Sequence, residues 1–207
     1  ALVSDIVSGT SYTSTLSLGQ WYWRVQAIDA SGSTSDYTGA RSFFIAEPVV
    51  PVSTDPGSDY NPTLVKTSDG TLLSVWERDG ELFQAVSTDG GEDWSNPTLL
   101  VGCCRYQPTL VRMSDDTVWL TYRHDDDIWY RTSENGSLDW SSEIQLTTHP
   151  ADDADPDMTQ TADGRIWAVW RSDRTNGSDI WYKTKLNSGS SWSSPTELPV
   201  DSGWNTH

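Results

Sequence analysis

The chain has 207 residues, enough to bury a core as one large domain or two small ones. Its formal net charge of −17 argues against nucleic acid or an anionic membrane surface as a partner and suits an extracellular or cell-surface protein. No apolar run approaches the roughly 18 residues of a membrane-spanning helix, so we expect no membrane insertion. Twelve Trp residues, with frequent Gly and Pro, favour an all-β chain.

Residues 1–46 contain a tryptophan-rich run that predicts a half-buried strand. Trp21, Trp23, Val25 and Ala27 alternate with polar residues, and RSFFI at 41–45 predicts a second strand. The segment resembles the last strands of a fibronectin type III domain, with Trp21 where that family usually has its corner tyrosine. The preceding strands of such a sandwich are missing, so we expect only a partial fibronectin type III-like β-sandwich.

Residues 47–59, EPVVPVSTDPGSD, form a proline-rich stretch that predicts a linker between two modules.

A repeat begins after this linker. NPTLVKTSDGTLLSVWERD at 61–79 aligns with QPTLVRMSDDTVWLTYRHD at 107–125 and DPDMTQTADGRIWAVWRSD at 155–173. The recurring prolines, Pro62, Pro108 and Pro156, are 46 and 48 residues apart. Each repeat holds four short alternating runs separated by turn signals such as Asp-Gly. Four antiparallel strands at this period are typical of β-propeller blades, which we place at about 60–106, 107–154 and 155–207.

A tryptophan loop closes each repeat. STDGGEDW at 87–94 fits the pattern Ser-x-Asp-x-Gly-x-x-Trp and resembles the Asp-box, or bacterial neuraminidase repeat, of sialidase-like propellers. The resemblance covers about residues 58–207, with decayed copies in the second and third repeats. Its residues are Ser87, Asp89, Gly91 and Trp94, then Ser133, Asn135 and Trp140, then Trp192. We expect a structural role, with the carboxylate accepting backbone N–H bonds and the tryptophan packing at the blade edge.

Three blades are too few for a closed ring, which normally needs four to eight. GWNTH at 203–207 matches the residues before the first repeat proline. Two interpretations remain open: the sequence is part of a longer protein, or neighbouring subunits complete one another.

The loops between the second and third strands of each blade predict a ligand face. Each loop contains an Arg and an Asp at positions that look equivalent. The guanidinium group of Arg can bind a carboxylate through two parallel hydrogen bonds. The alternative is an exposed Arg/Asp pair with little energetic effect. The candidate ligand-binding residues are Arg78, Arg123, His124, Asp125, Arg171, Asp173 and Arg174.

Catalysis has no positive signal in this sequence. The resemblance implies that a sialidase needs an arginine triad, an acid/base Asp and a Tyr nucleophile assisted by Glu. The family's Arg-Ile-Pro motif is absent, and no Tyr/Glu pair can be matched residue by residue. The acidic run at 125–127 is typical of a solvated loop. We therefore predict no catalytic residue in this segment.

Metal and thiol chemistry leave weaker signals. Asp153, Asp155 and Asp157 alternate in a way that suits Ca²⁺ but lack the glycine and final Glu of a calcium loop, so no cofactor is predicted. The three histidines are too scattered for zinc. The adjacent Cys103 and Cys104 could form a vicinal disulfide, which we favour, bridge to another subunit, or remain thiols.

These features predict an extracellular or cell-surface, non-catalytic module. It would bind an acidic glycan or a surface protein, or build an assembly such as a filament by self-association. The alternative is a fragment of a sialidase-like glycoside hydrolase or polysaccharide lyase. Fold alone does not choose the substrate.

Overall fold

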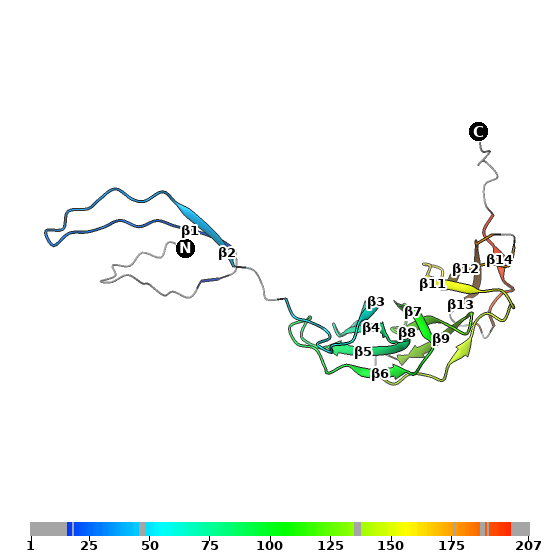
Figure 1. Ribbon diagram of the computed structural model, residues 1–207. Helices are drawn as coiled ribbons and strands as arrows, with labels where there is room; N and C mark the ends of the chain where they lie inside the picture. The colour runs from blue at the N-terminus through cyan, green and yellow to red at the C-terminus, as the bar shows by residue number, and fades with distance from the viewer. Residues whose placement is uncertain are drawn as a thin grey trace. The chain divides into compact units, whose positions relative to one another are not determined.

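The computed structural model describes residues 16–17, 19–45, 49–134, 138–175, 177–186, 189 and 191–199. The chain divides into two compact units, Ala1–Val49 and Val50–His207, which are considered separately below (Figure 1). No helix among the described residues is long and apolar enough to cross a membrane. All of the named elements are β-strands, in agreement with the all-β prediction.

The first unit contains one antiparallel hairpin, formed by β1 (Gly19–Trp23) and β2 (Arg41–Ile45). Trp21 is partly buried, and its Nε1 donates a hydrogen bond to the carbonyl oxygen of Ser17 at 2.7 Å. The strand ends earlier than the alternation predicted, and Trp23 and Val25 are 44% and 52% exposed. Two strands provide no second layer that could cover this face. The described residues of the first unit thus form a two-stranded hairpin and no β-sandwich.

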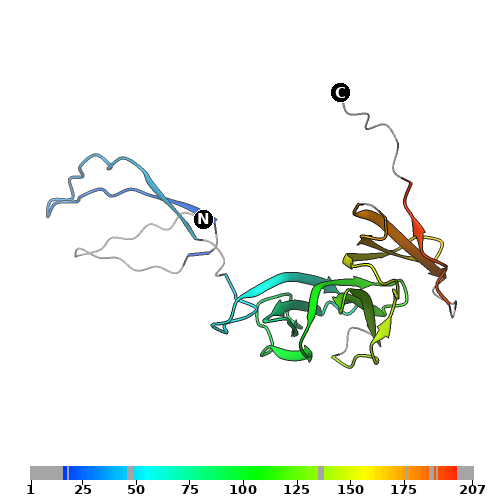
Figure 2. The same cartoon turned by 45° about the vertical axis from the view of Figure 1, so that its right-hand side comes forward.

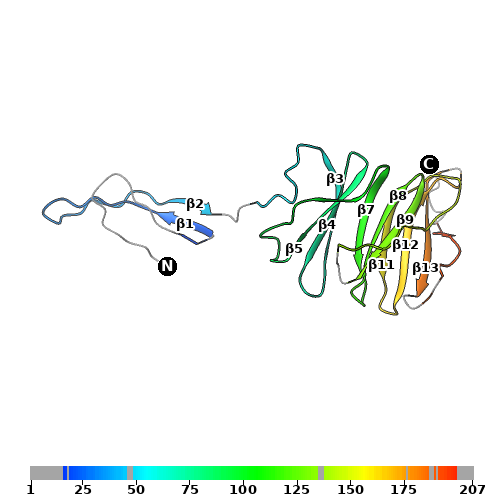
Figure 3. The same cartoon turned by 90° about the horizontal axis from the view of Figure 1, so that it is seen from below.

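The second unit contains three four-stranded antiparallel sheets, as predicted. Figure 3 shows them side by side in chain order. The first sheet is β3 (Asp59–Lys66), β4 (Leu72–Arg78), β5 (Glu81–Ser87) and β6 (Thr98–Val101). The second is β7 (Arg105–Arg112), β8 (Val118–His124), β9 (Asp127–Ser133) and β10 (Ile144–Gln145). The third is β11 (Asp153–Gln160), β12 (Arg165–Ser172), β13 (Asp179–Leu186) and β14 (Thr196–Glu197).

Tight turns join the second and third strands of the first two sheets. Asp79 and Gly80 have φ of 52° and 77°, and Asp125 and Asp126 have φ of 50° and 64°. Two consecutive positive φ values are the geometry of a two-residue hairpin turn, which Asp and Gly tolerate best. These turns contact the start of the next sheet, since Arg105 N donates to Gly80 O at 2.9 Å. The hairpin turns and the sheet-to-sheet connections therefore share one end of the unit.

The hydrophobic core lies between the sheets. The first joint, between the first and second sheets, includes Leu73, Val75, Leu82, Leu110, Leu120 and Tyr122. The second joint, between the second and third sheets, includes Trp119, Ile128, Tyr130, Ile166 and Trp170. In β12, burial alternates residue by residue, which is what strands with one covered face require.

The tryptophan loop of the first sheet is closed by side-chain hydrogen bonds. Ser87 Oγ donates to Asp89 Oδ1 at 2.7 Å, and Gly91 N donates to Ser87 Oγ at 2.8 Å. Asp93 N donates to both Asp89 carboxylate oxygens at 3.0 Å. The hydrogen bond from Ser87, followed by that from Asp93, holds the pKa of Asp89 below its ordinary value of 3.8. Gly91 has φ of 100°, a conformation that favours glycine.

The later tryptophans of this series pack between sheets. Trp140 packs against the first joint, where its Nε1 donates to Gln84 Oε1 of the first sheet at 2.9 Å. Trp192 packs against the second joint, with its ring centroid 6.1 Å from those of Trp119 and Tyr130. Ser133 is buried at the end of β9, whereas Asn135 lies outside the described residues. Each of these two tryptophans therefore joins its own sheet to the preceding one.

Candidate functional site

An open hollow of about 310 Å³ lies where the first strands of the three sheets come together. It is lined by equivalent residues of all three repeats. They are Asn61 and Pro62, then Gln107, Pro108 and Thr109, then Asp155 and Pro156. The volume is near the lower end of the range for small-molecule sites, about 300 to 1,000 Å³. The hollow is therefore large enough for one small ligand unit.

A bulge in each first strand forms this lining. Asn61, Gln107 and Asp155 have φ of 48°, 56° and 53°, and the strand register shifts at each of them. The proline that follows cannot donate to the sheet, which is compatible with a bulge. Positive φ is uncommon for residues other than glycine and is found at functional sites more often than elsewhere. The same uncommon backbone conformation thus recurs at three positions around one hollow.

Hydrogen bonds join the three bulges. Glu77 Oε2 accepts from Asn61 Nδ2 at 3.1 Å and from Gln107 N at 3.3 Å. Gln107 Nε2 donates to Asp155 Oδ1 at 2.5 Å, and Asp155 N donates to Gln107 Oε1 at 3.0 Å. Gln107 is therefore the central member of the series, in contact with the first and third sheets. These bonds orient amide and carboxylate groups at the rim of the hollow.

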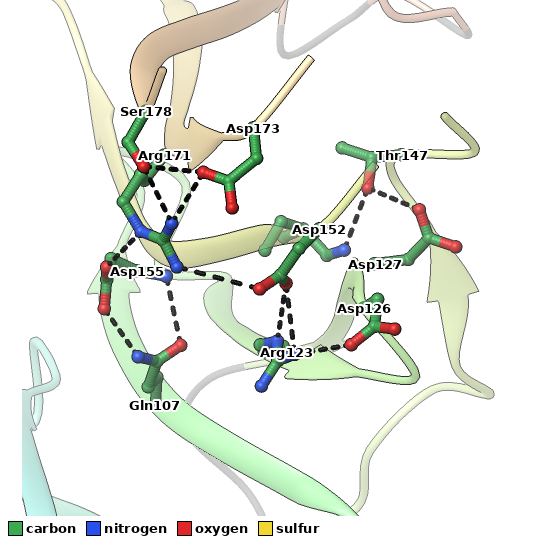
Figure 4. Close-up of polar contacts among 11 residues, drawn as sticks. Gln107, Arg123, Asp126, Asp127, Thr147, Asp152, Asp155, Arg171, Asp173 and Ser178 are labelled. Carbon is green, nitrogen blue, oxygen red and sulfur yellow. Dashed lines mark hydrogen bonds and ion pairs between the residues drawn. The ribbon is translucent and has the colours of Figure 1, made fainter. Parts of the chain in front are cut away.

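Arg171 and Arg123 lie next to this series, and Figure 4 shows their contacts. Arg171 Nε donates to Asp155 Oδ2 at 3.1 Å, and its Nη1 donates to Asp173 Oδ1 at 2.9 Å. Arg123 Nε donates to Asp152 Oδ1 at 3.1 Å, and the other Asp152 oxygen is 3.8 Å from Arg171 Nη2. The two guanidinium groups are therefore held in ion pairs with carboxylates of the chain itself.

Arg78 does not occupy the position of these two arginines. In the strand register Arg123 pairs with Tyr106 and Arg171 pairs with Ala154, whereas Tyr60 pairs with Glu77. Glu77 therefore stands at the position of Arg123 and Arg171, and the predicted equivalence of Arg78 was wrong by one residue. Because side chains alternate along a strand, Arg78 lies on the opposite face of its sheet.

The guanidinium of Arg78 is instead buried in a separate ion pair. The residue is 6% exposed, and its Nε donates to Asp59 Oδ1 at 2.7 Å. Its Nη2 donates to Ser53 Oγ at 2.6 Å, and its Nη1 lies 3.2 Å from Asp55 Oδ2. The hydrogen bond from Arg78 holds the pKa of Asp59 below its ordinary value of 3.8, despite the opposing effect of burial. Arg78 does not line the hollow.

The side chain of Arg174 is 7% exposed and forms an ion pair with Asp153, with Nη2 and Oδ2 2.7 Å apart. Its guanidinium also lies 4.8 Å from the ring centroid of Trp181. The three aspartates considered for calcium have different partners, since Asp155 contacts Gln107 and Arg171, and Asp157 Oδ1 accepts from Met158 N at 2.8 Å. Among the described residues no group of three or more His, Cys, Asp or Glu side chains could hold a metal ion.

The remaining candidates lie outside the lining of the hollow. His124 Nε2 is 3.1 Å from Asp125 Oδ2, and its ring centroid is 5.4 Å from that of Trp129. Cys103 and Cys104 are exposed free thiols with sulfurs 3.3 Å apart. Cys104 has φ of 70°.

A tyrosine and a glutamate do meet in the first joint, although sequence comparison gave no such pair. Tyr122 Oη donates to Glu143 Oε1 at 2.8 Å, and Arg105 Nη2 donates to both Glu143 oxygens at 3.0 Å. Tyr122 is 0% exposed, and burial, with the hydrogen bond to Glu143, raises its pKa far above the ordinary value of 10.0. A buried phenol that resists ionisation has no access to a ligand in the hollow. The pair instead stabilises the first joint.

Burial alone would raise the pKa of Glu143. The hydrogen bonds from Tyr122 and Arg105 outweigh this effect and leave that pKa below the ordinary value of 4.5. Glu143 is therefore a charged group held within the joint.

Sequence reasoning missed Asn61 and Gln107, which line the hollow, and Glu77, which accepts hydrogen bonds from both. Asp155, which also lines the hollow, was considered only for calcium. Asn61, Gln107 and Glu77 carry no motif of their own. Their signal was positional, because two of them stand immediately before the recurring proline. A non-glycine residue repeatedly placed before that proline could have indicated the bulge.

No protein-family model matches the sequence, and no curated protein matches it. Among solved structures, an α-L-arabinanase of Penicillium chrysogenum complexed with arabinobiose is 16% identical with a TM-score of 0.56. An α-L-arabinofuranosidase of Fusarium graminearum, complexed with an iminosugar inhibitor, is 18% identical with a TM-score of 0.54. The NanB sialidase of Streptococcus pneumoniae is 12% identical with a TM-score of 0.54.

These matches cover 69%, 71% and 87% of the present chain. The chain spans about half the length of the three structures, since each match covers 50% of the other protein. At these identities the likeness concerns the fold alone. The chain shares a propeller-like fold with these structures, which confirms the propeller prediction. The fibronectin type III resemblance and the specific assignment to the Asp-box family stay predictions.

Proposed function

We propose that the three sheets form the sugar-binding part of a propeller glycoside hydrolase and that the hollow at the three bulges is its sugar subsite. The observation that carries this proposal is the repeated bulge, which brings Asn61, Gln107 and Asp155 to one open hollow of about 310 Å³. Amides and carboxylates held by hydrogen bonds suit the hydroxyl groups of a sugar, which both donate and accept. The arabinobiose and iminosugar complexes of two similar structures support a glycan as ligand.

The charge of the lining favours a neutral sugar over an acidic one. The lining of the hollow contains no Lys or Arg, and Asp155 carries a negative charge when ionised. The nearby Arg171 and Arg123 already pair with aspartates, so binding a sugar carboxylate would have to displace those partners. The expectation of an acidic glycan depended on arginines whose guanidinium groups are free to bind a sugar carboxylate. We therefore propose a neutral, hydroxyl-rich glycan such as a pentosan.

A non-catalytic binding module is the second candidate, and the hydrogen bonds of the carboxylates favour it. Glu77 accepts two N–H bonds at one oxygen, and Asp155 accepts from Gln107 and Arg171 at its two oxygens. Both carboxyl groups are therefore already engaged by donors of the chain itself. A two-carboxylate glycosidase needs one carboxyl placed to protonate the leaving-group oxygen of the sugar. The existing hydrogen bonds of these two groups support a binding role.

Calorimetric titration of the full chain with arabino-oligosaccharides, xylo-oligosaccharides and sialyllactose tests the subsite. We expect a neutral pentose oligosaccharide to bind and Gln107→Ala to weaken binding roughly 10-fold, because two oriented hydrogen-bonding groups are lost. The matched control is Gln160→Ala, at the far end of β11, where Gln160 accepts a hydrogen bond from Ser114 N. Equal affinity in both variants, or binding of sialyllactose alone, would contradict the subsite as proposed.

Release of reducing ends from arabinan and xylan distinguishes the two candidates. Hydrolysis that is lost in Glu77→Gln and Asp155→Asn would support a complete catalytic site in this chain. Binding without hydrolysis would support a binding module, or a part of an enzyme whose acid lies elsewhere. The acidic composition supports an extracellular or cell-surface location. Detection of the native protein in culture medium and surface fractions tests that location.

A further inference from the structure

The two joints between sheets are built from equivalent parts. In the second joint, Trp119 and Tyr130 of the second sheet are stacked with centroids 4.9 Å apart. The ring of Trp192, from the third sheet, stands edge-on against both of them. In the first joint, Trp140 of the second sheet packs toward the first sheet at the corresponding place, where its Nε1 donates to Gln84 Oε1. A joint therefore consists of a tryptophan from the later sheet and a receiving face on the earlier one.

The third sheet carries a second copy of this receiving face. Trp167 and Tyr182 occupy the positions of Trp119 and Tyr130, and their ring centroids are 5.0 Å apart. Both pairs are formed in the same way, by one residue of the second strand and one of the third. Among the described residues, no third aromatic ring contacts the Trp167 pair.

Burial shows the difference between the two faces. Ile128 and Leu146 of the second sheet are 0% and 2% exposed, whereas Ile180 and Leu198 of the third are 45% and 41% exposed. These positions are equivalent, because Leu146 N donates to Ile128 O and Leu198 N donates to Ile180 O, both at 2.8 Å. In Figure 2 the third sheet, in orange, follows the second sheet at the end of the series. We call Trp167, Ile180, Tyr182 and Leu198 the receiving face.

The first sheet carries the complementary part without a partner sheet. Trp94 stands where Trp140 and Trp192 stand in the later sheets, but it is half-buried and belongs to neither joint. Leu64 of the first strand is 57% exposed, whereas the equivalent Leu110 and Met158 are 8% and 5% exposed. We call Leu64 and Trp94 the inserting face.

We propose that the receiving face of one copy of this chain binds the inserting face of a second copy. Trp94 of one copy would then pack on the Trp167 and Tyr182 pair of the other, as Trp192 packs within the chain. Both complementary halves are present on one molecule, and the second joint provides the template for their fit. Such a contact is head-to-tail. The described residues of two copies contain six four-stranded sheets, a number within the four to eight blades that close a propeller.

The net charge of −17 on each copy opposes this association. Salt screens repulsion between like-charged molecules over about 10 Å at 0.1 M and over shorter distances at higher concentration. An apolar joint should therefore strengthen as salt is added. A contact made by ion pairs would weaken under the same change.

Sedimentation analysis of the full chain at increasing protein concentration tests the proposal. We expect a dimer, and we expect Trp94→Ala and Trp167→Ala each to weaken association at least about 30-fold, as truncation of a central interface tryptophan does. Tyr22→Ala is the control, because Tyr22 is 67% exposed in the first unit. Far-ultraviolet circular dichroism and thermal melting establish that each variant folds.

Mixing the two tryptophan variants gives the sharpest result. In a head-to-tail pair of unlike variants, one joint lacks both tryptophan partners while the other joint is intact. The mixture should therefore form heterodimers under conditions in which each variant alone is monomeric. A wild-type chain that stays monomeric at every concentration and salt level would overturn the proposal and assign these faces to another occupant. A dimer unaffected by both variants would overturn it as well.

Discussion

The indole Nε1 of Trp140 donates a hydrogen bond to Oε1 of Gln84 at 2.9 Å, and this bond connects the second sheet to the first. Gln84 is only 5% exposed. A buried amide oxygen that lost this donor would be left unsatisfied, because water does not reach it freely. Trp140 therefore contributes both apolar contact and a polar tie across the first joint.

Trp140→Phe should lower the free energy of unfolding by about 1 to 3 kcal/mol more than Trp192→Phe. Both changes shrink a tryptophan in a joint, but the buried Nε1 of Trp192 has no hydrogen-bond partner among the residues that the structure describes. Only the Trp140 variant loses a bond and leaves Gln84 unsatisfied. Urea denaturation of the two variants measures the difference. Equal losses would show that apolar packing alone determines the contribution of each tryptophan.

The ion pair of Arg78 and Asp59 predicts a pH dependence of stability. Arg78 holds the pKa of Asp59 below its ordinary value of 3.8, which is the value in the unfolded chain. The stabilisation is therefore complete above pH 3.8 and is lost as the pH falls through the lower pKa of the folded state. Asp59→Asn should cost about 1 to 3 kcal/mol at neutral pH, and this cost should shrink below pH 3.8.

Thermal melting of wild type and Asp59→Asn across this pH range measures the effect. The control is Asp55→Asn, because the Asp55 side chain is 51% exposed and its pair with Arg78 should contribute less than about 1 kcal/mol. A cost of Asp59→Asn that stays constant down to low pH would show that the carboxylate charge is not the cause.

Tyr122→Phe should destabilise the chain by about 1.5 to 3 kcal/mol, the usual contribution of a hydrogen bond to a charged group. The hydroxyl of Tyr122 donates to Glu143, which is partly buried and keeps its contacts with Arg105 after the change. Tyr106→Phe is the matched control, since Tyr106 is 38% exposed on the neighbouring strand. Sugar affinity should not change in either variant. A loss of binding with unchanged stability would instead place Tyr122 in the sugar site.

The adjacent thiols should close to a disulfide by losing two hydrogen atoms to an added disulfide oxidant. Their sulfurs are already 3.3 Å apart, and both side chains are exposed. The hydrogen bond with the Cys103 thiol raises the pKa of the Cys104 thiol above its ordinary value of 9.0. Because the thiolate is the reactive form, the reaction of Cys104 should still accelerate above pH 9.0.

Mass spectrometry of the oxidised chain measures ring closure, and a thiol-reactive chromophore measures the pH profile. Cys103→Ala is the comparison, because it removes the group that raises the pKa of Cys104. We expect Cys104 in this variant to react fully at lower pH than in the wild type. A covalent dimer in place of an internal ring would assign the thiols to contact with another subunit.

Much of the fold was predictable because it depends on local pattern. The alternation in β12 and the Asp-Gly turn at residues 79–80 specify strands and hairpins within a few residues. The recurring proline indicated three equivalent sheets. The partners of the tryptophans were not predictable in this way, because Trp140 and Gln84 are 56 residues apart. The sequence predicted a tryptophan at the blade edge, whereas the structure places Trp140 and Trp192 between sheets.

The candidate site was predicted less well, for a geometric reason. Each loop between the second and third strands contains an Arg followed by an Asp, but the aligned repeats place Glu77, and not Arg78, opposite Arg123. A shift of one residue in a strand moves the side chain to the opposite face. The ion pairs of Arg171 with three aspartates also join residues whose proximity follows from the bulges and turns. The residue types indicated that charged groups lie at this end of the sheets. Which of these groups form ion pairs with one another could be seen only in the structure.

The proposed sugar subsite and the hydrophobic core use different residues. Asn61, Gln107 and Asp155 are held out of the regular ladder, and none of them belongs to the hydrophobic clusters that hold the sheets together. Replacing these three side chains therefore leaves the apolar packing between the sheets unchanged, although it removes hydrogen bonds that connect the bulges. A library randomised at only those positions would explore the ligand preference of the proposed subsite on an unaltered hydrophobic interior.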